Sequence, residues 1–273
     1  MARPGWWWAV GATVIGAWAT CALAAPESGQ SRAAFEAPSA LLVDVPTAGT
    51  TPKGTVETRG RAFPAGGIEL RLDLGVLDRV SVGVGFGGVQ IIGDGDPRWD
   101  PRPGFALKAR VLDETWTLPA FALGIDTRGA GFWDRDRERF QFKSRGFYAV
   151  LSKNYAFLGD FSFHGGASRS FEAKDDGDPT LFAGLEKSVG SRIGLGVEYD
   201  LARNDDRKDG AYGRGRGYLN AVLRMRPGPQ VEVRVVVRDM LDNSELAEPR
   251  LADVVADEGW GREVALSYYS NLF

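Results

Sequence analysis

The sequence predicts an all-β protein, an antiparallel transmembrane β-barrel of about twelve strands with ten as the alternative. Three observations predict it. Apolar and polar residues alternate with a period of two through most of the chain after residue 53. The connections between the predicted strands alternate between short and long. Beyond the leader, only 245–257 carries a trace of helical periodicity, and the 36 glycines among 273 residues suit bent or closely packed strands better than helices.

The first 24 residues have the layout of a cleaved signal peptide. Arg3 is their one charge, an apolar run follows from Trp6 to Ala19, and Ala22-Leu23-Ala24 is a small-x-small cleavage site. An uncleaved anchor helix is the alternative, because the stretch from Trp6 to Ala25 is 20 residues long and could span a bilayer. The polar residues that follow favour cleavage. The predicted domains are therefore a signal peptide (1–24), a periplasmic N-terminal segment (25–53) and a barrel (54–273).

Strict alternation predicts each strand in turn. In 67–75, leucine or isoleucine takes every even position, whereas Glu69, Arg71 and Asp73 take odd positions. Comparable patterns predict strands at 54–63, 67–75, 78–87, 104–112, 116–126, 146–153, 158–171, 179–188, 191–201, 217–226, 230–238 and 263–272.

The connections indicate how these strands are arranged. Short ones are expected at 76–77, 113–115, 154–157, 189–190 and 227–229, and longer ones at 88–103, 127–145, 172–178, 202–216 and 239–262. Only 64–66 breaks the alternation. Short periplasmic turns, long outer loops and an even strand number are typical of bacterial outer-membrane barrels, with both termini in the periplasm. A soluble sandwich or lipocalin-like barrel is the alternative, since its strands also alternate.

The chain ends on Phe273, which closes an alternating strand. A C-terminal phenylalanine in this setting resembles the signal that the barrel-assembly machinery reads. Asn271 departs from that signal, because an aromatic or apolar residue usually stands two positions before the terminal phenylalanine.

The polar face of each strand is predicted to face the barrel lumen, because a charge on the lipid face costs about 2–4 kcal/mol at the bilayer midplane. Both signs of charge occur there, so a salt-bridged lumen that fills itself and a polar conduit are both open. The predicted lumen-facing residues are Glu69, Arg71, Asp73, Lys108, Arg110, Asp126, Glu198, Asp200, Arg224, Arg226, Glu232, Arg234 and Arg238.

Composition excludes several function classes. A formal charge of −3 argues against a nucleic-acid binder, and a single cysteine excludes a disulfide framework and a cysteine-based zinc site. Clustered acidic residues at 94–96, 175–178 and 204–206 supply oxygen ligands that Ca²⁺ prefers, but solvated turns are the favoured interpretation. No cofactor or metal is predicted.

The one histidine, His164, raises the hypothesis of a barrel lipase, with Ser162 and Ser168 on the same face of its strand. Residues two apart on a strand lie roughly 6.6 Å apart at the backbone, and no G-x-S-x-G motif occurs. We therefore expect a protein that is not an enzyme.

Four segments resemble the YjbH family of outer-membrane β-barrels, in the order in which they occur there. Asp44-Val45-Pro46-Thr47-Ala48-Gly49, followed by Gly54, resembles a "TPSA…DG" segment, and Leu118 to Ile125 with Gly129 and Gly131 resembles an "LPxxALGLxDxxGTG" strand. Phe147 to Lys153 resembles a "YxVASK" strand, and Phe182 to Glu186 an "AGLEY" strand. The likeness covers most of 41–201, and this chain resembles a short, single-barrel version of the family.

The resemblance implies a non-enzymatic role in the production, export or surface assembly of an exopolysaccharide, in the bacterial outer membrane. It implies a polysaccharide and periplasmic or lipoprotein export partners. The predicted barrel and its C-terminal signal imply outer-membrane lipids and the barrel-assembly machinery as further partners, and the acidic charge argues against nucleic acid. The alternative function is a structural or adhesive surface barrel that recognises a partner through loops 127–145 and 202–216. The resemblance implies no catalytic residues.

Overall fold

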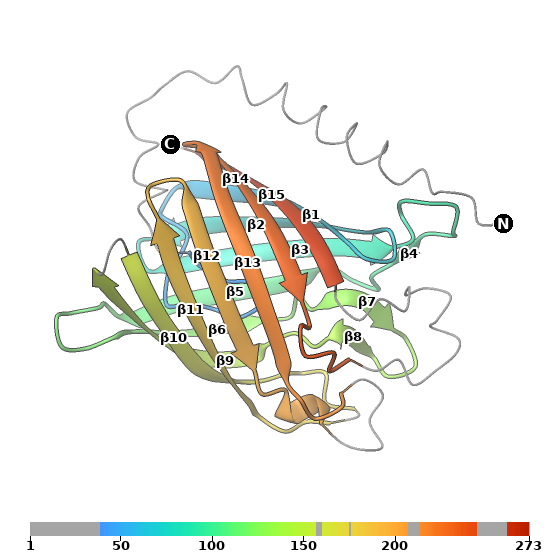
Figure 1. Cartoon of the computed structure of the whole chain (residues 1–273). Coiled ribbons are helices and arrows are strands. Elements are labelled where there is room, and N and C mark those ends of the chain that lie inside the picture. The colour runs from blue at the N-terminus through green and yellow to red at the C-terminus, as the bar shows by residue number, and fades with distance from the viewer. Residues whose placement is uncertain (1–38, 157–159, 175, 207–212, 245–260, 273) are drawn as a thin grey trace.

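Twelve long strands form one closed antiparallel ring in the computed structural model (Figure 1), which describes residues 39–156, 160–174, 176–206, 213–244 and 261–272. Each strand pairs with the next one around the ring, and β1 closes it by pairing with both β2 and β15. The strands are β1 (Thr55–Phe63), β2 (Gly67–Leu77), β3 (Val80–Val89), β5 (Gly104–Leu112), β6 (Ala120–Asp126), β9 (Gly146–Ala156), β10 (Asp160–Arg169), β11 (Thr180–Val189), β12 (Ile193–Asp200), β13 (Tyr218–Gly228), β14 (Val231–Arg238) and β15 (Gly261–Asn271).

Four smaller elements add to the twelve strands of the ring. The two-residue β4 (Arg98–Trp99) pairs with the end of β3, and β7 (Ala130–Asp134) and β8 (Arg139–Phe142) form a separate hairpin. A 3₁₀ helix, η1 (Arg203–Asp205), follows β12. Among the described residues, no helix is long and apolar enough to cross a membrane.

The predicted fold class is confirmed, and all twelve predicted strands are present. Two details differ. The strand predicted at 116–126 begins only at Ala120, directly after Pro119, which has no N–H to donate to a strand ladder. Connection 127–145, predicted as a plain loop, contains the β7–β8 hairpin.

The two faces of the ring have opposite chemistry. Leu70, Leu107 and Leu195 are 45%, 46% and 47% exposed on the outer face, whereas Glu69 and Lys108 are buried inside. In a soluble sandwich the apolar faces would instead be buried against each other. The soluble alternative is therefore wrong, and the outer face is built for acyl chains.

The connections divide the barrel into two ends. The β2–β3, β11–β12 and β13–β14 connections are short and lie at one end with the start of β1 and the end of β15, which we call the turn end. Connections 127–145 and 170–179 lie at the opposite end, the loop end, together with the ends of β12 and β14. The β5–β6 connection at the turn end is longer than predicted, because it spans 113–119.

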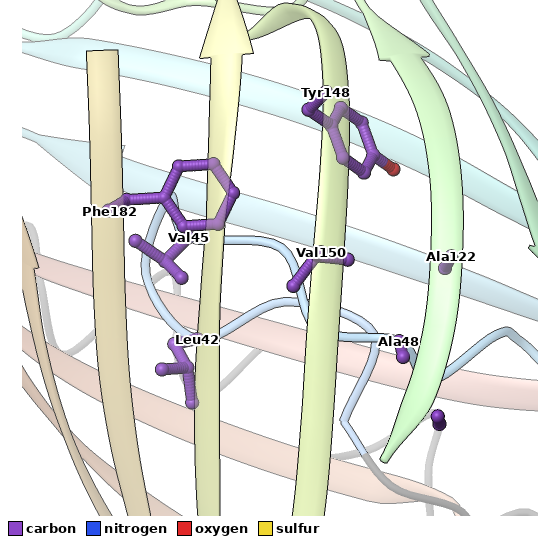
Figure 2. Close-up of a cluster of buried hydrophobic side chains, with 8 residues drawn as sticks. Leu42, Val45, Ala48, Ala122, Tyr148, Val150 and Phe182 are labelled. Carbon is purple, nitrogen blue, oxygen red and sulfur yellow. The ribbon is translucent and has the colours of Figure 1, made fainter. Parts of the chain in front are cut away.

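Residues 39–53, which we call the inner segment, lie inside the ring (Figure 2). Leu42, Val45, Thr47 and Ala48 are each at most 1% exposed. The N-terminal segment predicted to be periplasmic (25–53) thus has its residues 39–53 held within the barrel, because their apolar side chains and backbone find partners on the inner wall. The predicted signal peptide (1–24), residues 25–38 and Phe273 lie outside the described residues.

Candidate functional site

The inner segment makes a tight reversal within the barrel. Leu42 N–H donates to the carbonyl of Val45 over 3.0 Å, and Thr47 N–H donates to the carbonyl of Ala40 over 3.3 Å. This turn directs most of the remaining backbone groups outward, toward the wall. The strands must therefore supply their hydrogen-bond partners, since buried backbone groups are almost always paired.

Glu198 on β12 binds the tip of the reversal. The N–H groups of Val43, Asp44 and Val45 all donate to its carboxylate, over 2.8 to 3.0 Å. Successive N–H groups that converge in this way form an anion-binding concavity. Asn220 on β13 donates a further bond to the same carboxylate over 2.8 Å, so Glu198 is saturated with donors.

Two cations bind the carbonyl groups of the inner segment. Lys108 on β5 donates to the carbonyls of Ala40, Thr47 and Gly49, over 2.5, 3.1 and 3.1 Å. An ammonium group has three donors, and all three are used here. Arg234 on β14 donates from Nη1 to the carbonyls of Leu41 and Leu42, over 3.3 and 3.2 Å.

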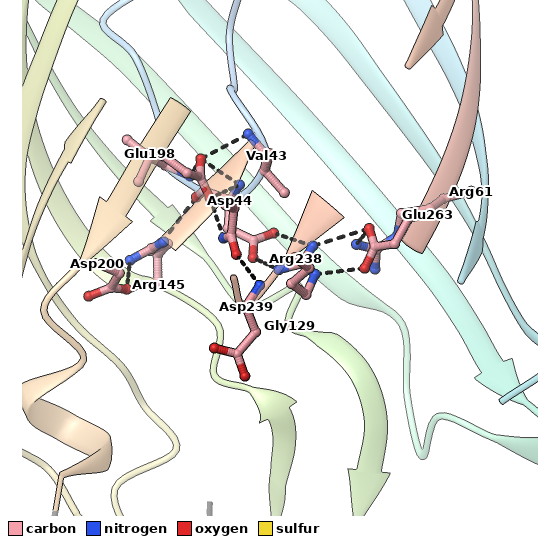
Figure 3. Close-up of polar contacts among 12 residues, drawn as sticks. Val43, Asp44, Arg61, Gly129, Arg145, Glu198, Asp200, Arg238, Asp239 and Glu263 are labelled. Carbon is pink, nitrogen blue, oxygen red and sulfur yellow. Dashed lines mark hydrogen bonds and ion pairs between the residues drawn. The ribbon is translucent and has the colours of Figure 1, made fainter. Parts of the chain in front are cut away.

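Asp44 is the one charged side chain of the turn, and it lies among arginines (Figure 3). Its carboxylate forms an ion pair with Arg238 on β14, which also pairs with Glu263 on β15 over 2.6 Å. Arg145, just before β9, donates to the carbonyl of Asp44 over 3.1 Å and pairs with Asp200. The turn is thus tied to opposite sides of the ring.

A small apolar patch on the wall receives the side chains of the inner segment (Figure 2). Leu42, Val45 and Ala48 form one buried cluster with wall residues Ala120 and Ala122 on β6, Tyr148 and Val150 on β9, and Phe182 on β11. Gly184 on β11 makes room for Leu42, because a Cβ atom there would stand 2.3 Å from Leu42 Cδ1.

His164 takes part in this anchoring. Its Nδ1 lies 2.8 Å from Oγ of Ser152, which faces it across the β9–β10 ladder, and Ala48 N–H donates to the same oxygen over 2.8 Å. The serines considered from sequence are not its partners, since Ser162 donates to Asn154. Ser152 is buried beneath the inner segment, so this pair does not present a nucleophile to a substrate.

The charged wall residues also pair with one another. Glu69 bridges Arg61 and Arg71, over 2.6 and 2.7 Å, and Glu232 bridges Arg226 and Arg234, over 2.9 and 2.6 Å. Arg128, in the connection after β6, pairs with Asp73 and Asp126 over 2.8 and 2.9 Å. Most of these charges are therefore compensated within the protein.

The structure places the thirteen residues predicted to face the lumen at different depths. Eight are buried: Glu69, Arg71, Lys108, Glu198, Arg224, Glu232, Arg234 and Arg238. Four are half-buried in ion pairs or hydrogen bonds at the interior: Asp73, Asp126, Asp200 and Arg226. Arg110 lies at the turn end of β5, where it pairs with Asp113 over 3.0 Å.

The loop end is covered by a folded cap made of the β7–β8 hairpin and η1. Arg139 on β8, fully buried, pairs with Asp205 over 2.6 Å, and Tyr218 donates to the same carboxylate over 2.6 Å. Glu172 accepts the N–H groups of Phe140 and Ser144, and burial raises the pKa of its carboxyl despite these bonds. A solvated turn at 204–206 is therefore a wrong prediction for Asp205, and no described residues form a cluster of three or more possible metal ligands.

Sequence reasoning missed several interior residues. Glu57 and Arg59 on β1 pair over 2.5 Å inside the ring, and their alternate spacing was the available signal. Arg145 and Ser152 carry no such signal in the sequence. Their role depends on contacts with the inner segment, which is far from both of them along the chain. The apolar run Leu41-Leu42-Val43 gave a signal for burial of that segment, but none for what would bury it.

Four segments singled out in the sequence lie together at this site. One of them, residues 44–49, is the turn itself. The other three lie on β6, β9 and β11 and supply the apolar patch that the turn contacts. These short segments, which are far apart in the sequence, therefore form one contiguous contact.

Comparison with known proteins gives only remote likeness. No family model matches the chain, and no curated protein matches it. Among solved structures, the NanC porin is similar with a TM-score of 0.48 and 11% identity, covering 78% of this chain and 98% of that one. The KdgM porin has a TM-score of 0.45 and 10% identity with the same coverage, and Omp33 of Acinetobacter baumannii has 0.43 and 8%, covering 80% and 96%.

Proposed function

We propose that this chain is a bacterial outer-membrane barrel that takes part in the production or export of an exopolysaccharide and is not itself an enzyme. In this proposal its interior is the passage or binding surface, and the inner segment closes it. Outer-membrane lipids surround the barrel, the assembly machinery inserts it, and periplasmic or lipoprotein partners deliver the polysaccharide.

One observation carries the proposal. The segments similar to an exopolysaccharide-associated family are the turn and the wall patch that hold each other inside the barrel. A likeness confined to strand ends or lipid-facing positions would reflect only barrel construction. A likeness gathered at the inner contact instead favours a shared use of the interior.

The chemistry of the interior supports a non-enzymatic role. The Ser152–His164 pair is used to anchor Ala48. The acidic groups around it are engaged with arginines and backbone donors, which suits a binding surface better than a hydrolytic site.

Deletion of the gene tests this function. We expect the deletion strain to produce altered amounts of capsule or matrix polysaccharide under producing conditions, and the intact gene to restore them. A gene whose product lacks 39–50 should restore barrel assembly, checked by the different migration of the folded form in an unboiled gel, but not normal polysaccharide. Unchanged polysaccharide in the deletion strain contradicts the proposal.

A structural or adhesive barrel is the second candidate, and the folded cap favours it. The Arg139–Asp205 pair joins the β7–β8 hairpin of loop 127–145 to η1 at the loop end. If this cap recognises a partner, trimming both loops abolishes cell-surface binding and leaves polysaccharide output intact. Loss of polysaccharide with binding unchanged would argue for the first candidate.

A further inference from the structure

We propose that the wall surface holding the inner segment is also the binding site of a polyhydroxylated chain, an oligosaccharide, which replaces residues 39–50 inside the barrel. This inference rests on the proposed function and adds to it a binding site, the inner wall surface, and a competitor for that site, residues 39–50.

The wall binds the backbone of the inner segment more than its side chains. Lys108 and Arg234 together donate to five carbonyl groups, and Glu198 accepts from three N–H groups. Such anchors recognise an alternation of acceptors and donors rather than a particular side chain. A hydroxyl group is both donor and acceptor, so a chain of sugar hydroxyls satisfies the same anchors.

The same surface offers apolar faces beside its polar anchors. Tyr148 and Phe182 belong to the buried cluster that includes Val45 and Leu42, and Phe182 lies beside Val45 (Figure 2). Aromatic and aliphatic walls with a few fixed polar groups are the usual make-up of a small-molecule site. The C–H face of a sugar ring can take the place of the valine and leucine side chains there.

The inner segment leaves polar groups near this site unsatisfied. His164 Nε2 is buried and has no hydrogen-bond partner among the described residues, although Nδ1 of the same ring contacts Ser152. Arg224 Nη2 forms an ion pair with Glu186, whereas Nε and Nη1 of the same guanidinium are buried without a hydrogen-bond partner in the described part of the chain. Buried polar groups are nearly always paired, so the inner segment is an incomplete ligand for this wall.

The inner segment is also a tethered competitor. It leads directly into β1, where Gly54 N–H donates to the carbonyl of Gly75 over 2.8 Å. A tethered ligand acts at an effective concentration on the order of millimolar, which weakens the apparent affinity of any free ligand for the same site. Removing the competitor should therefore strengthen oligosaccharide binding.

The test is calorimetric titration of the refolded barrel in detergent with cellohexaose, a neutral oligosaccharide. The variant lacking 39–50 should bind it at least about tenfold more tightly than the full chain. Glu198→Gln or Phe182→Ala in that shortened background should remove most of the gain. Equal affinity with and without 39–50, or a gain that both substitutions leave intact, overturns the inference.

A disulfide that fixes the inner segment to the wall gives a second test, which does not require the shortened barrel to fold. Leu42→Cys with Gly184→Cys places the two side chains together, since Leu42 Cγ lies 3.7 Å from where a Cβ at 184 would stand. The only native cysteine, Cys21, is in the predicted leader. The oxidised protein should not bind cellohexaose and the reduced protein should; identical titrations in both states overturn the inference.

These outcomes separate the inference from the proposed function. If the deletion strain has altered polysaccharide but neither titration shows competition, the site is wrong and the function stands. If competition is seen while polysaccharide is unchanged in the strain, the function is wrong and the saccharide site stands.

Discussion

Single positions on the wall decide whether the inner segment fits. Gly184 faces Leu42 at a point where any side chain would collide with it. The preceding residue, Ala183, faces outward and is exposed. Two neighbouring small residues on one strand thus have different reasons to be small, because successive side chains point to opposite faces.

Gly184→Leu is therefore expected to loosen the inner segment, since overpacking a buried contact costs about 1–3 kcal/mol. With Ala48→Cys as a reporter, maleimide should label the variant about tenfold faster than the parent. The matched control is Ala183→Leu, which adds the same side chain to the lipid-facing side and should leave labelling unchanged. Equal labelling in all three proteins would contradict the role of Gly184.

Glu198→Gln removes the negative charge that three amides share. Hydrogen bonds to charged groups contribute about 1.5–3 kcal/mol each, so the amides of Val43, Asp44 and Val45 should exchange with deuterium at least tenfold faster. Mass spectrometry of the peptide that contains them measures this. Glu186→Gln is the control, because Glu186 contacts Arg224 and not the inner segment; acceleration in both variants would point to a general loosening.

The β7–β8 hairpin pairs with no strand of the barrel ring and is held by a buried ion pair between Arg139 and Asp205. Its strands are only five and four residues long, which is too short for a hairpin to be stable alone. Arg139 compensates by pairing with Asp205 and donating to the carbonyls of Phe140 and Gln141, over 2.9 Å each.

Arg139→Met should therefore open the cap. Removing one partner of a buried pair leaves an uncompensated charge and costs about 3–5 kcal/mol. We expect proteolytic nicking within 127–145 while the barrel remains folded by its migration in an unboiled gel. Arg135→Met, at an exposed position of the same connection, is the control. A variant as resistant as the wild type would show that the hairpin is held by other contacts.

The stability of the whole barrel depends on the environment of its two faces, the apolar outer face and the ion-paired inner face. Exposed leucines, valines and phenylalanines circle the outside, and ion pairs bridge the inside. Only a lipid surround makes this arrangement favourable, because water would have to cover the apolar face.

A charge placed on the outer face is expected to destabilise the barrel according to depth. Leu70→Arg, in the middle of β2, should lower the free energy of unfolding in lipid vesicles by about 2–4 kcal/mol. Val76→Arg, near the turn end of the same strand, should cost about 0–1 kcal/mol. Denaturant titration of vesicle-inserted protein measures both, and equal costs would contradict a lipid-spanning orientation for β2.

Some interior positions could be predicted and others could not. Alternation alone assigns Lys108, Glu198 and Arg234 to the inner face, since the side-chain period of a strand is two. Their ligand, the inner segment, is far from each of them in sequence, and no local pattern encodes such a contact. The pairing of His164 with Ser152 was missed for the same reason, because it depends on the register between β9 and β10.

Period-two alternation and the rhythm of turn lengths by themselves determined a twelve-stranded barrel, because a strand in a ring meets one environment on each face and local sequence records that. Only the tertiary structure decided that residues 39–53 lie inside, with Glu198, Lys108 and Arg234 holding their backbone. Closing the ring brings hydrogen-bond donors and acceptors from many strands together around the inner segment. The free energy of holding that segment therefore depends on the assembled wall and not on any single strand.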